Sequence, residues 1–439
     1  MTMELDQILS AHLPKVGVHG HRSVSLQTTW ARVSPVLASI GVTRVADITD
    51  LDRLAIPVYQ AIMPASQDSI STYSGKGPTK LAAKVSAVME AVERYCASAP
   101  PPVDRTASVS QLRAENASFL DPREQNLELA AGYDDDSTIP WCWGYDLAGS
   151  APVLVSSEQA GDSWHRTGVL VNPISTTNGL ASGNNLIEAV IHGLYEVIER
   201  DSWTLAVLVS QWLPPLVREH TGRPQVAARV LHALELDEFS PLVREIAGRI
   251  RAAAGIELQV FAVLSDLAVP TVLAVTVEKG SVSTRHLGLG TDADSEVAAV
   301  RALTEVAQSR AGDVAGGRED ITTPDEEVPP WLLHTRRSSN PVGWESGPSL
   351  HKHDLPDYAS DDIVQDLSAT VELLRGVGLE KVIAVDLSRD GIPAKVCRVI
   401  VPGAESWGAD HSRLGRRATR AWNEAVRSHA TPPSPVVSA

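Results

Sequence analysis

Glutamates recur at helical spacing in three stretches of this sequence. Glu90 and Glu93 are three residues apart, Glu196 and Glu199 repeat that spacing, and Glu305 lies in a third stretch. Side chains three or four residues apart share one face of a helix, where like charges repel each other. Magnesium neutralises such charge, because it binds carboxylate oxygens and completes its shell with water and phosphates. The pattern indicates that magnesium binds among these carboxylate-bearing helices.

The residues around the glutamates are mostly apolar. Valine and alanine dominate 85–92, while leucine, isoleucine, tyrosine and valine surround Glu196 and Glu199. A solvated helix face is the alternative for any single stretch, since Glu is a good helix former. Largely buried helices, however, make carboxylates costly unless a cation or an arginine neutralises them. Because the three stretches share this pattern, we favour the metal site over solvated faces.

Arginines accompany the glutamates in all three stretches. Arg94, Arg200, Arg301 and Arg310 carry planar guanidinium groups that suit phosphate oxygens. Ion pairs with the nearby glutamates are the alternative role for each of them. Arginines that bind phosphate beside carboxylates that bind magnesium would together form a nucleotide site.

Two glycine-containing segments precede these stretches. The segment 74–77 (Ser-Gly-Lys-Gly) is not a P-loop, because a Walker A motif has Ser or Thr directly after its lysine, whereas Gly77 follows Lys76. The predicted nucleotide site is therefore not of the P-loop class. After Ser-Gly at 182–183, Asn184 and Asn185 would cap the second helix or present amides to a ligand.

Long helices must position these residues. The periodicity predicts helices over about 80–95, 185–209 and 294–310, and apolar β-rich runs over 258–264, 270–277, 381–387 and 395–401. A proline suits a strand start in the segment 56–59. The polar segment 66–77 is expected to be flexible, and the segment 313–361 to form a loop or lid. The segment 431–439 is expected to be an extended tail. Alternation of helices and strands predicts an α/β or α+β fold.

An internal repeat links the first two helical stretches. At a constant offset of 106 the paired positions are Gly77 and Gly183, Ser86 and His192, Glu90 and Glu196, Glu93 and Glu199, and Arg94 and Arg200. This correspondence predicts a duplicated unit whose two carboxylate faces meet across one cavity.

Composition excludes several classes of protein. The chain has 439 residues and a formal net charge of −16, which disfavours a nucleic-acid partner. No apolar run long enough to span a membrane and no signal peptide is present, so we expect a cytoplasmic protein. Cys96, Cys142 and Cys397 are widely separated, which favours reduced, packed cysteines over disulfides or a zinc site.

The combined motifs resemble the YcaO family. They are Ser-Gly-Lys-Gly at 74–77, Ser-x3-Glu-x2-Glu-Arg at 86–94, Asn-Gly-Leu-Ala-Ser-Gly-Asn at 178–184, Glu-x3-His-x3-Glu-x2-Glu-Arg-Asp at 188–201, and Arg-Ala-Leu-Thr-Glu at 301–305. The resemblance covers roughly 19–405. It implies a duplicated YcaO-type fold with mixed sheets flanked by helices around a cavity for ATP and Mg²⁺. It further implies ATP-dependent phosphorylation of a peptide amide oxygen, followed by attack of a nucleophile and loss of phosphate.

The resemblance also implies residue roles. Magnesium ligands would be Glu90, Glu93, Glu196, Glu199 and Glu305, and nucleotide contacts would come from Lys76, Ser86, Asn184, Glu188, His192, Arg200 and Arg310. His192 stands where the family is expected to have glutamine, and a helix-packing histidine is the alternative. Pro433 and Pro435 of the tail are similar to a proline-rich carboxyl terminus that lies near the family's active site.

Family members differ in the nucleophile that attacks the activated amide. We expect a stand-alone cyclodehydratase that forms an azoline or a macrocyclic or open amidine on a ribosomally made precursor peptide. The alternatives are thioamide formation with a sulfur donor and a TfuA-type partner, and a non-catalytic accessory protein. A homo-oligomer is left open. The expected organisation is an N-terminal part (1–65), a core with the ATP and magnesium site (66–410), and a C-terminal helix with the tail (411–439).

Overall fold

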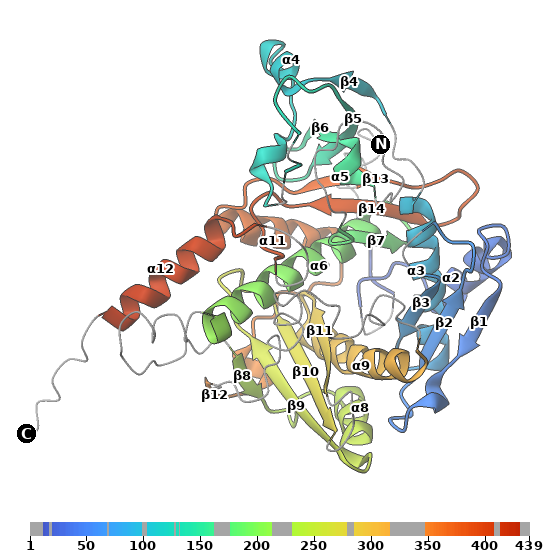
Figure 1. Ribbon diagram of the computed structural model, residues 1–439. Helices are drawn as coiled ribbons and strands as arrows, with labels where there is room; N and C mark the ends of the chain where they lie inside the picture. The colour runs from blue at the N-terminus through green and yellow to red at the C-terminus, as the bar shows by residue number, and fades with distance from the viewer. Residues whose placement is uncertain are drawn as a thin grey trace, which may run out of the picture.

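The computed structural model describes residues 12–16, 20–67, 70–98, 103–126, 129–130, 132–161, 176–212, 231–278, 285–316, 347–407 and 413–430. Within these residues three β-sheets are covered by helices (Figure 1). This confirms the predicted mixed α/β class. No helix in the described part of the chain is both long enough and apolar enough to cross a membrane.

The three sheets are built mainly from antiparallel pairs. The first has the order β1-β2-β3, the second β11-β10-β9-β8-β12, and the third β4-β5-β13-β14-β7 with β6 also paired to β5. Only the β8–β12 pair is parallel among the described strands. The strands are β1 Arg44–Asp47, β2 Val58–Ile62, β3 Thr72–Lys76, β4 Arg105–Ala107, β5 Ile139–Asp146, β6 Ala151–Ser156, β7 Leu180–Gly183, β8 Leu231–Leu234, β9 Ile256–Val263, β10 Thr271–Glu278, β11 Arg285–Thr291, β12 Gly347–Leu350, β13 Ile383–Asp386 and β14 Lys395–Ile400.

The helices vary from single turns to long rods. The α-helices are α2 Leu26–Val33, α3 Lys80–Ser98, α4 Val109–Ala114, α5 Ser157–Ala160, α6 Leu186–Val207, α8 Pro241–Ala252, α9 Ser295–Val314, α11 Ile363–Gly376 and α12 Arg416–Ala430. Short turns of other helix types are η1 Ser34–Val36, η2 Thr49–Leu51, η3 Pro122–Glu124, the π-helical η4 Leu208–Trp212 and η6 Lys352–Asp354.

Helix α6 is the centre of the molecule. It runs between the six-stranded and five-stranded sheets and contacts β7 and β14 on one side and β9 and β11 on the other (Figure 1). Apolar residues surround most of its circumference, which is typical of a helix buried on all sides. Asn185 begins it as the N-cap, since its side chain accepts a hydrogen bond from the Glu188 amide at 3.0 Å.

Each of three long helices follows the strand on which it packs. These units are β3–α3, β7–α6 and β11–α9. Glycines make the close approach possible, because a Cβ added to Gly75 would lie 2.0 Å from the Ala87 nitrogen, and one on Gly290 would lie 2.1 Å from the Ala298 oxygen. Helix α9 also contacts β2 and β3, and α3 contacts β7, so the three units meet.

Several sequence-based boundaries need correction. The segment 66–77, expected to be flexible, contains the strand β3, in which Tyr73 is buried and the neighbouring positions alternate with it. The expected loop 313–361 contains β12 and η6, and α9 extends to Val314. Helix α3 extends to Ser98 rather than residue 95. The regular part of α6 ends at Val207, where the backbone becomes π-helical.

Candidate nucleotide and magnesium site

The two copies of the internal repeat carry the same ion pair. On α3 the Arg94 Nε lies 3.2 Å from Glu90 Oε1, and on α6 the Arg200 Nη2 lies 3.6 Å from Glu196 Oε1. Both pairs span four residues, so each arginine partly neutralises the carboxylate one turn before it. The alternative role of these two arginines, ion pairing with the glutamates, is therefore present in the structure.

Glu93 is the buried carboxylate of α3. It is 7% exposed, whereas the Glu90 side chain is 36% exposed. Burial, followed by the negative charge of Glu90, raises the pKa of Glu93 well above its usual value, and Glu196 of α6 adds to this effect. Because Glu196 acts on Glu93, these carboxylates of α3 and α6 lie within electrostatic range of each other; the shared cavity inferred from the repeat stays a prediction. A cation there would lower the electrostatic cost.

Glu199 occupies the equivalent buried position on α6. It is 3% exposed, and its Oε2 atom has no hydrogen-bond partner among the described residues. Burial and the nearby charge of Glu305 raise its pKa to about 7. A buried carboxylate oxygen without a donor is costly. A proton or a metal ion on this atom would remove that cost.

Glu305 brings the third unit into the same region. The Lys76 ammonium of β3 forms an ion pair with its Oε2. Burial raises the pKa of Glu305, but the charge and hydrogen bond of Lys76 outweigh it and hold that pKa below the usual value. Glu305 is therefore a carboxylate anion near Glu199. Lys76, which belongs to the Ser-Gly-Lys-Gly segment, points toward Glu305.

The five glutamates fit a magnesium site that is completed by other ligands. Within the described ranges no three His, Cys, Asp or Glu side chains are close enough together to hold a metal ion by themselves. Magnesium commonly binds one or two carboxylates and takes its remaining ligands from water and from phosphates. The donor-less oxygen of Glu199 and the clustered charge match this chemistry. Glu199, with Glu196 and Glu305 nearby, would hold such an ion.

Glu188 lies at the start of α6 in a tight polar network. Its side chain is fully buried and accepts hydrogen bonds from the Ser23 amide at 2.7 Å and the Asn184 amide at 2.9 Å. The Asn184 side chain also donates to it at 2.8 Å. Burial opposes ionisation, yet Arg22 and the Ser23 hydrogen bonds hold the pKa of Glu188 below its usual value. The structure thus shows Glu188 and Asn184 joined to the N-terminal segment at the helix entrance.

His192 lies deeper along the same helix. Its Nε2 is 3.3 Å from Arg301 Nη1 of α9, and its ring centroid is 5.8 Å from that of His21. Burial and the positive charge of Arg301 lower the pKa of His192 well below 6.5, so the ring is neutral at pH 7. His192 Nδ1 has no hydrogen-bond partner among the described residues.

A neighbouring pair, His21 and Asp292, was absent from the sequence-based site. His21 Nδ1 lies 3.0 Å from Asp292 Oδ2, and both side chains are almost fully buried. His21 also contacts the Tyr195 ring edge-on. These residues are 271 positions apart in sequence, and no periodic pattern links them. The only available signal was the polar cluster His-Gly-His-Arg-Ser at 19–23.

Four further predicted residues remain, of which two lie in the described part of the chain. Arg310 is 3% exposed and donates to Asp52 at 3.0 Å and Glu278 at 2.9 Å, which is the ion-pair alternative. Ser86 is half-buried on α3. Pro433 and Pro435 lie outside the described residues. Nucleotide contacts of Arg310 and Ser86, and a role for the tail, stay predictions.

The three cysteines are buried, as expected for packed residues. Cys96, Cys142 and Cys397 are free thiols with no measurable exposure. Burial raises the pKa of Cys96 to about 12, that of Cys142 to about 12, and that of Cys397 well above its usual value. Thiolates are the reactive form of cysteine, so none of the three is poised as a nucleophile.

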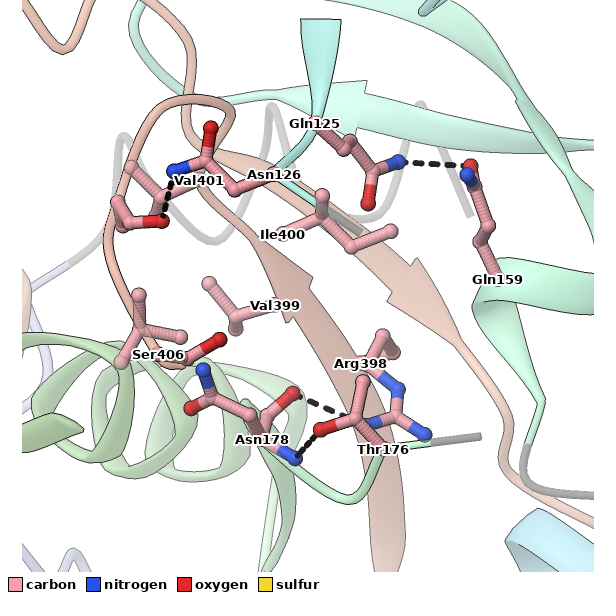
Figure 2. Close-up of a pocket in the computed structure, with 12 residues that line it drawn as sticks. Gln125, Asn126, Gln159, Thr176, Asn178, Arg398, Val399, Ile400, Val401 and Ser406 are labelled. Atoms are coloured by element: carbon pink, nitrogen blue, oxygen red, sulfur yellow. Dashed lines mark hydrogen bonds between the residues drawn. The ribbon is translucent and has the colours of Figure 1, made fainter. Parts of the chain in front are cut away.

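A small cavity with mixed polar and apolar walls lies along β14, and none of the five predicted glutamates lines it (Figure 2). Arg398 reaches into it and is 2% exposed. Its guanidinium donates to the main-chain oxygens of Ala160, Asn178 and Gly161 at 3.3, 2.9 and 3.3 Å. The cavity volume is about 60 Å³, too small for a nucleotide. Arg398 thus ties the 178–184 motif to the sheet rather than serving the predicted site.

The fold and the site together define a class of protein. It is an α/β protein in which strand–helix units related by an internal repeat bring carboxylates from three helices to one region. The model of the YcaO cyclodehydratase family, described as ATP- and Mg²⁺-binding, matches residues 74–405. The chain belongs to the YcaO family, which confirms the predicted family and its cofactors, ATP and Mg²⁺.

Relatives of similar length support this membership. The chain is 38% identical to an uncharacterized protein of Methanothermobacter thermautotrophicus, over 87% of this chain and 94% of that protein. It is 32% identical to an uncharacterized protein in the tfuA 3′ region of Rhizobium leguminosarum bv. trifolii, over 90% and 92% of the two chains.

Solved structures share the fold. The YcaO protein from Methanopyrus kandleri, bound with AMPPCP and Mg²⁺, superposes with a TM-score of 0.67 at 26% identity and covers 96% of this chain and 98% of its own. A heterocyclase in complex with substrate and cofactor gives a TM-score of 0.71 at 23% identity. It covers 90% of this chain, which spans about half (54%) of that longer protein.

Proposed function

We propose that this protein uses ATP and Mg²⁺ to phosphorylate a backbone amide oxygen of a ribosomally made precursor peptide, and that cyclodehydration to an azoline or amidine follows. The observation that carries the proposal is the chain of contacts between three strand–helix units: Glu93 of α3 interacts with Glu196 of α6, Glu199 of α6 interacts with Glu305 of α9, and Lys76 of β3 pairs with Glu305. One oxygen of Glu199 has no donor among the described residues. Membership of the YcaO family and the AMPPCP and Mg²⁺ bound to the Methanopyrus kandleri relative support it.

The residues of the chain supply position and charge. Mg²⁺, when bound, would neutralise phosphate charge during transfer. Glu196 and Glu199 of α6 and Glu305 of α9 would hold this ion. Lys76, which pairs with Glu305, would be a second cation beside the bound phosphates. Arg200 is 32% exposed beside Glu196 and can turn toward the nucleotide. Phosphoryl transfer needs little more than such positioning and electrostatic stabilisation.

The nucleophile would come from outside this chain. The three cysteines are buried thiols of raised pKa, so a covalent sulfur intermediate on the enzyme is disfavoured. A side chain or the amino terminus of the peptide would attack the activated amide carbon, and phosphate would leave. This yields a net loss of one water from the peptide.

Thioamide formation is the second candidate, with an external sulfur donor in place of the peptide nucleophile. The relative encoded in the tfuA 3′ region of Rhizobium leguminosarum bv. trifolii favours it and suggests a TfuA-type partner. A purely accessory role is disfavoured because all five predicted glutamates are present and four of them interact electrostatically across helices.

Peptide mass distinguishes the candidates. The full chain would be incubated with ATP, Mg²⁺ and a precursor peptide encoded beside its gene, with and without a sulfide source. Loss of one water supports cyclodehydration, whereas replacement of one oxygen by sulfur supports the thioamide. ATP consumption that never depends on peptide, with no mass change in either arm, would contradict both.

A further inference from the structure

An open groove lies beside helix α12, apart from the candidate nucleotide site. Its volume is about 890 Å³, within the range of about 300–1,000 Å³ that ligand pockets occupy. The walls are residues 123–126, the segment 377–381 that follows α11, the turn at 402–403, and α12 with the residues 413–415 before it. None of the predicted ATP or magnesium residues lines it.

The α12 wall of the groove is strongly basic. Arg416, Arg420 and Arg427 line it at helical spacing, and Arg413 precedes them. Their positions at i, i+4 and i+11 place the three helix residues on one face. Among the described residues, neither Arg416 nor Arg420 has a hydrogen-bond or ion-pair partner, and both are exposed. In a chain with a net charge of −16, two exposed and unpaired arginines one helical turn apart are unexpected.

The remaining charges in the groove do not cancel this stripe. Glu124 on the opposite wall already pairs with Lys381, with 2.9 Å between Oε2 and Nζ. Glu380 and Glu424 are the other acidic lining residues. The groove therefore keeps an excess of positive charge that faces its interior.

The orientation of α12 is fixed by contacts on its other faces. Arg417 forms a buried ion pair with Asp201 of α6 at 2.8 Å, and a second contact with Asp266 at 2.6 Å. Ala418, with partly buried Trp422, packs against η4, which extends α6. These contacts set the rotation of the helix and leave Arg416 and Arg420 directed at the groove. The outer part of α12 projects from the body of the molecule (Figure 1).

We propose that this groove binds an acidic segment of the peptide substrate, away from the amide that is modified. The idea rests on the proposed function, because it takes the substrate to be a peptide. Arginine pairs with carboxylates through two parallel hydrogen bonds, so Asp or Glu side chains suit the stripe. An extended nucleic acid suits it less, because the net negative charge of the rest of the surface repels a long polyanion.

An ion pair connects the α12 wall of the groove to α6, the helix that carries two of the candidate metal ligands. Asp201, the partner of Arg417, follows Glu199 by two residues on α6. Two residues turn a helix by about 200° and advance it by about 3 Å. The groove and the carboxylates therefore lie on nearly opposite faces of α6, and a peptide that occupies both must pass around this helix. Binding in the groove would act mainly on KM for the peptide.

Fluorescence anisotropy tests the proposal with the full chain. The probe is a labelled short peptide of alternating Glu and Gly, with the matching Lys and Gly peptide as its counterpart. Wild-type protein should bind the Glu peptide, more weakly as salt rises, and should not bind the Lys peptide. The double variant Arg416→Glu with Arg420→Glu should bind the Glu peptide about tenfold or more weakly.

A control double variant distinguishes loss of the groove arginines from the change in the net charge of the protein. Arg32→Glu with Arg251→Glu makes the same charge change at exposed sites on α2 and α8, and its binding should stay within about twofold of wild type. Equal loss in both double variants, or no binding by wild type, would overturn the proposal. Tighter binding of a single-stranded oligonucleotide than of the Glu peptide would overturn the assignment to peptides. Should the Glu variant unfold, as melting would reveal, Arg416→Gln with Arg420→Gln gives the same test.

Mg·ATP binding, measured on the same samples, tests the proposed function independently of peptide binding in the groove. Binding of the Glu peptide without binding of Mg·ATP would support the groove and contradict the function. Binding of Mg·ATP without binding of the Glu peptide would overturn the groove alone.

Discussion

Lys76 of β3 and Glu305 of α9 form an ion pair that joins the first strand–helix unit to the third. Because Lys76 holds the pKa of Glu305 below its usual value while burial and Glu305 itself raise that of Glu199 to about 7, the two neighbouring carboxylates differ in protonation. Lys76, with Arg200 and Arg301, thus adds positive charge to a region where three helices meet. This arrangement suits a site that receives a cation and a polyanion together.

Replacing Lys76 by Met should affect ligand binding more than stability. Both partners of its ion pair keep some solvent contact, at 18% and 25% exposure, so the free energy of unfolding should change by about 1 kcal/mol or less. Affinity for Mg·ATP should fall about tenfold or more, because a cation beside the phosphates is lost. Isothermal titration calorimetry and urea unfolding measure the two effects.

Lys80→Met is the matched control for this change. Lys80 pairs with Asp47 at 2.9 Å, and its side chain is 66% exposed. Its Mg·ATP affinity should equal that of wild type. An equal loss in both lysine variants would show that Lys76 acts only through overall charge.

Glu188 should matter to stability. Its buried carboxylate accepts hydrogen bonds from the amides of Ser23 and Asn184, and each hydrogen bond to a charged group is worth about 1.5–3 kcal/mol. Glu188→Ala should therefore lower the free energy of unfolding by about 3 kcal/mol, as measured by urea unfolding. The exposed Glu245→Ala on α8 should change it by about 0.5 kcal/mol or less. Similar values for both variants would contradict a stabilising role of the hydrogen bonds that Glu188 accepts.

Stability should depend on the protonation of His192. Its pKa in the folded chain lies well below the unfolded value of 6.5, so the unfolded chain binds more protons as pH falls through that value. Stability is therefore lost as pH drops below about 6.5. His192→Gln removes this proton uptake and should reduce the loss between about pH 7 and pH 5.5 by about 1 kcal/mol. Thermal melts across this range check the slope, and an unchanged slope would refute the account.

The cysteines should be dispensable for chemistry. Cys96→Ala, Cys142→Ala and Cys397→Ala should each keep ATP turnover and peptide modification, at a stability cost of about 1 kcal/mol for the lost packing. Phosphate release and peptide mass are the measurements. A folded variant that still binds ATP but no longer modifies peptide would point to a sulfur relay through that cysteine.

The sequence periodicity predicted the three long helices, whereas strand β3 was not predicted. Helices α3, α6 and α9 were found because their apolar and acidic residues repeat at 3.6-residue spacing over many turns. Strand β3 was missed because Ser74, Gly75 and Lys76 are poor strand formers. It forms because Gly75 lets α3 lie directly on it and because β2 pairs with it along its length. Tertiary packing here outweighs local propensity.

The candidate site was only partly visible in the sequence. The offset of 106 that relates Glu93 to Glu199 also relates Glu199 to Glu305, although the surrounding residues of the third unit have diverged. The long-range partners, by contrast, are Ser23 for Glu188 and Arg301 for His192, each more than 100 positions away in sequence. Contacts of this kind arise from the fold and leave no periodic signal.

The central claim is that Glu199 and its neighbours hold Mg²⁺ together with ATP. Calorimetric titration of ATP into the full chain, with and without Mg²⁺, tests it most directly when wild type is compared with Glu199→Gln. Glutamine keeps the shape of the side chain and removes its charge, so the fold should be kept, as circular dichroism would verify. We predict tight binding to wild type only in the presence of Mg²⁺, and loss of this magnesium dependence in Glu199→Gln. Equal, magnesium-dependent binding of ATP to a folded Glu199→Gln variant would contradict the account.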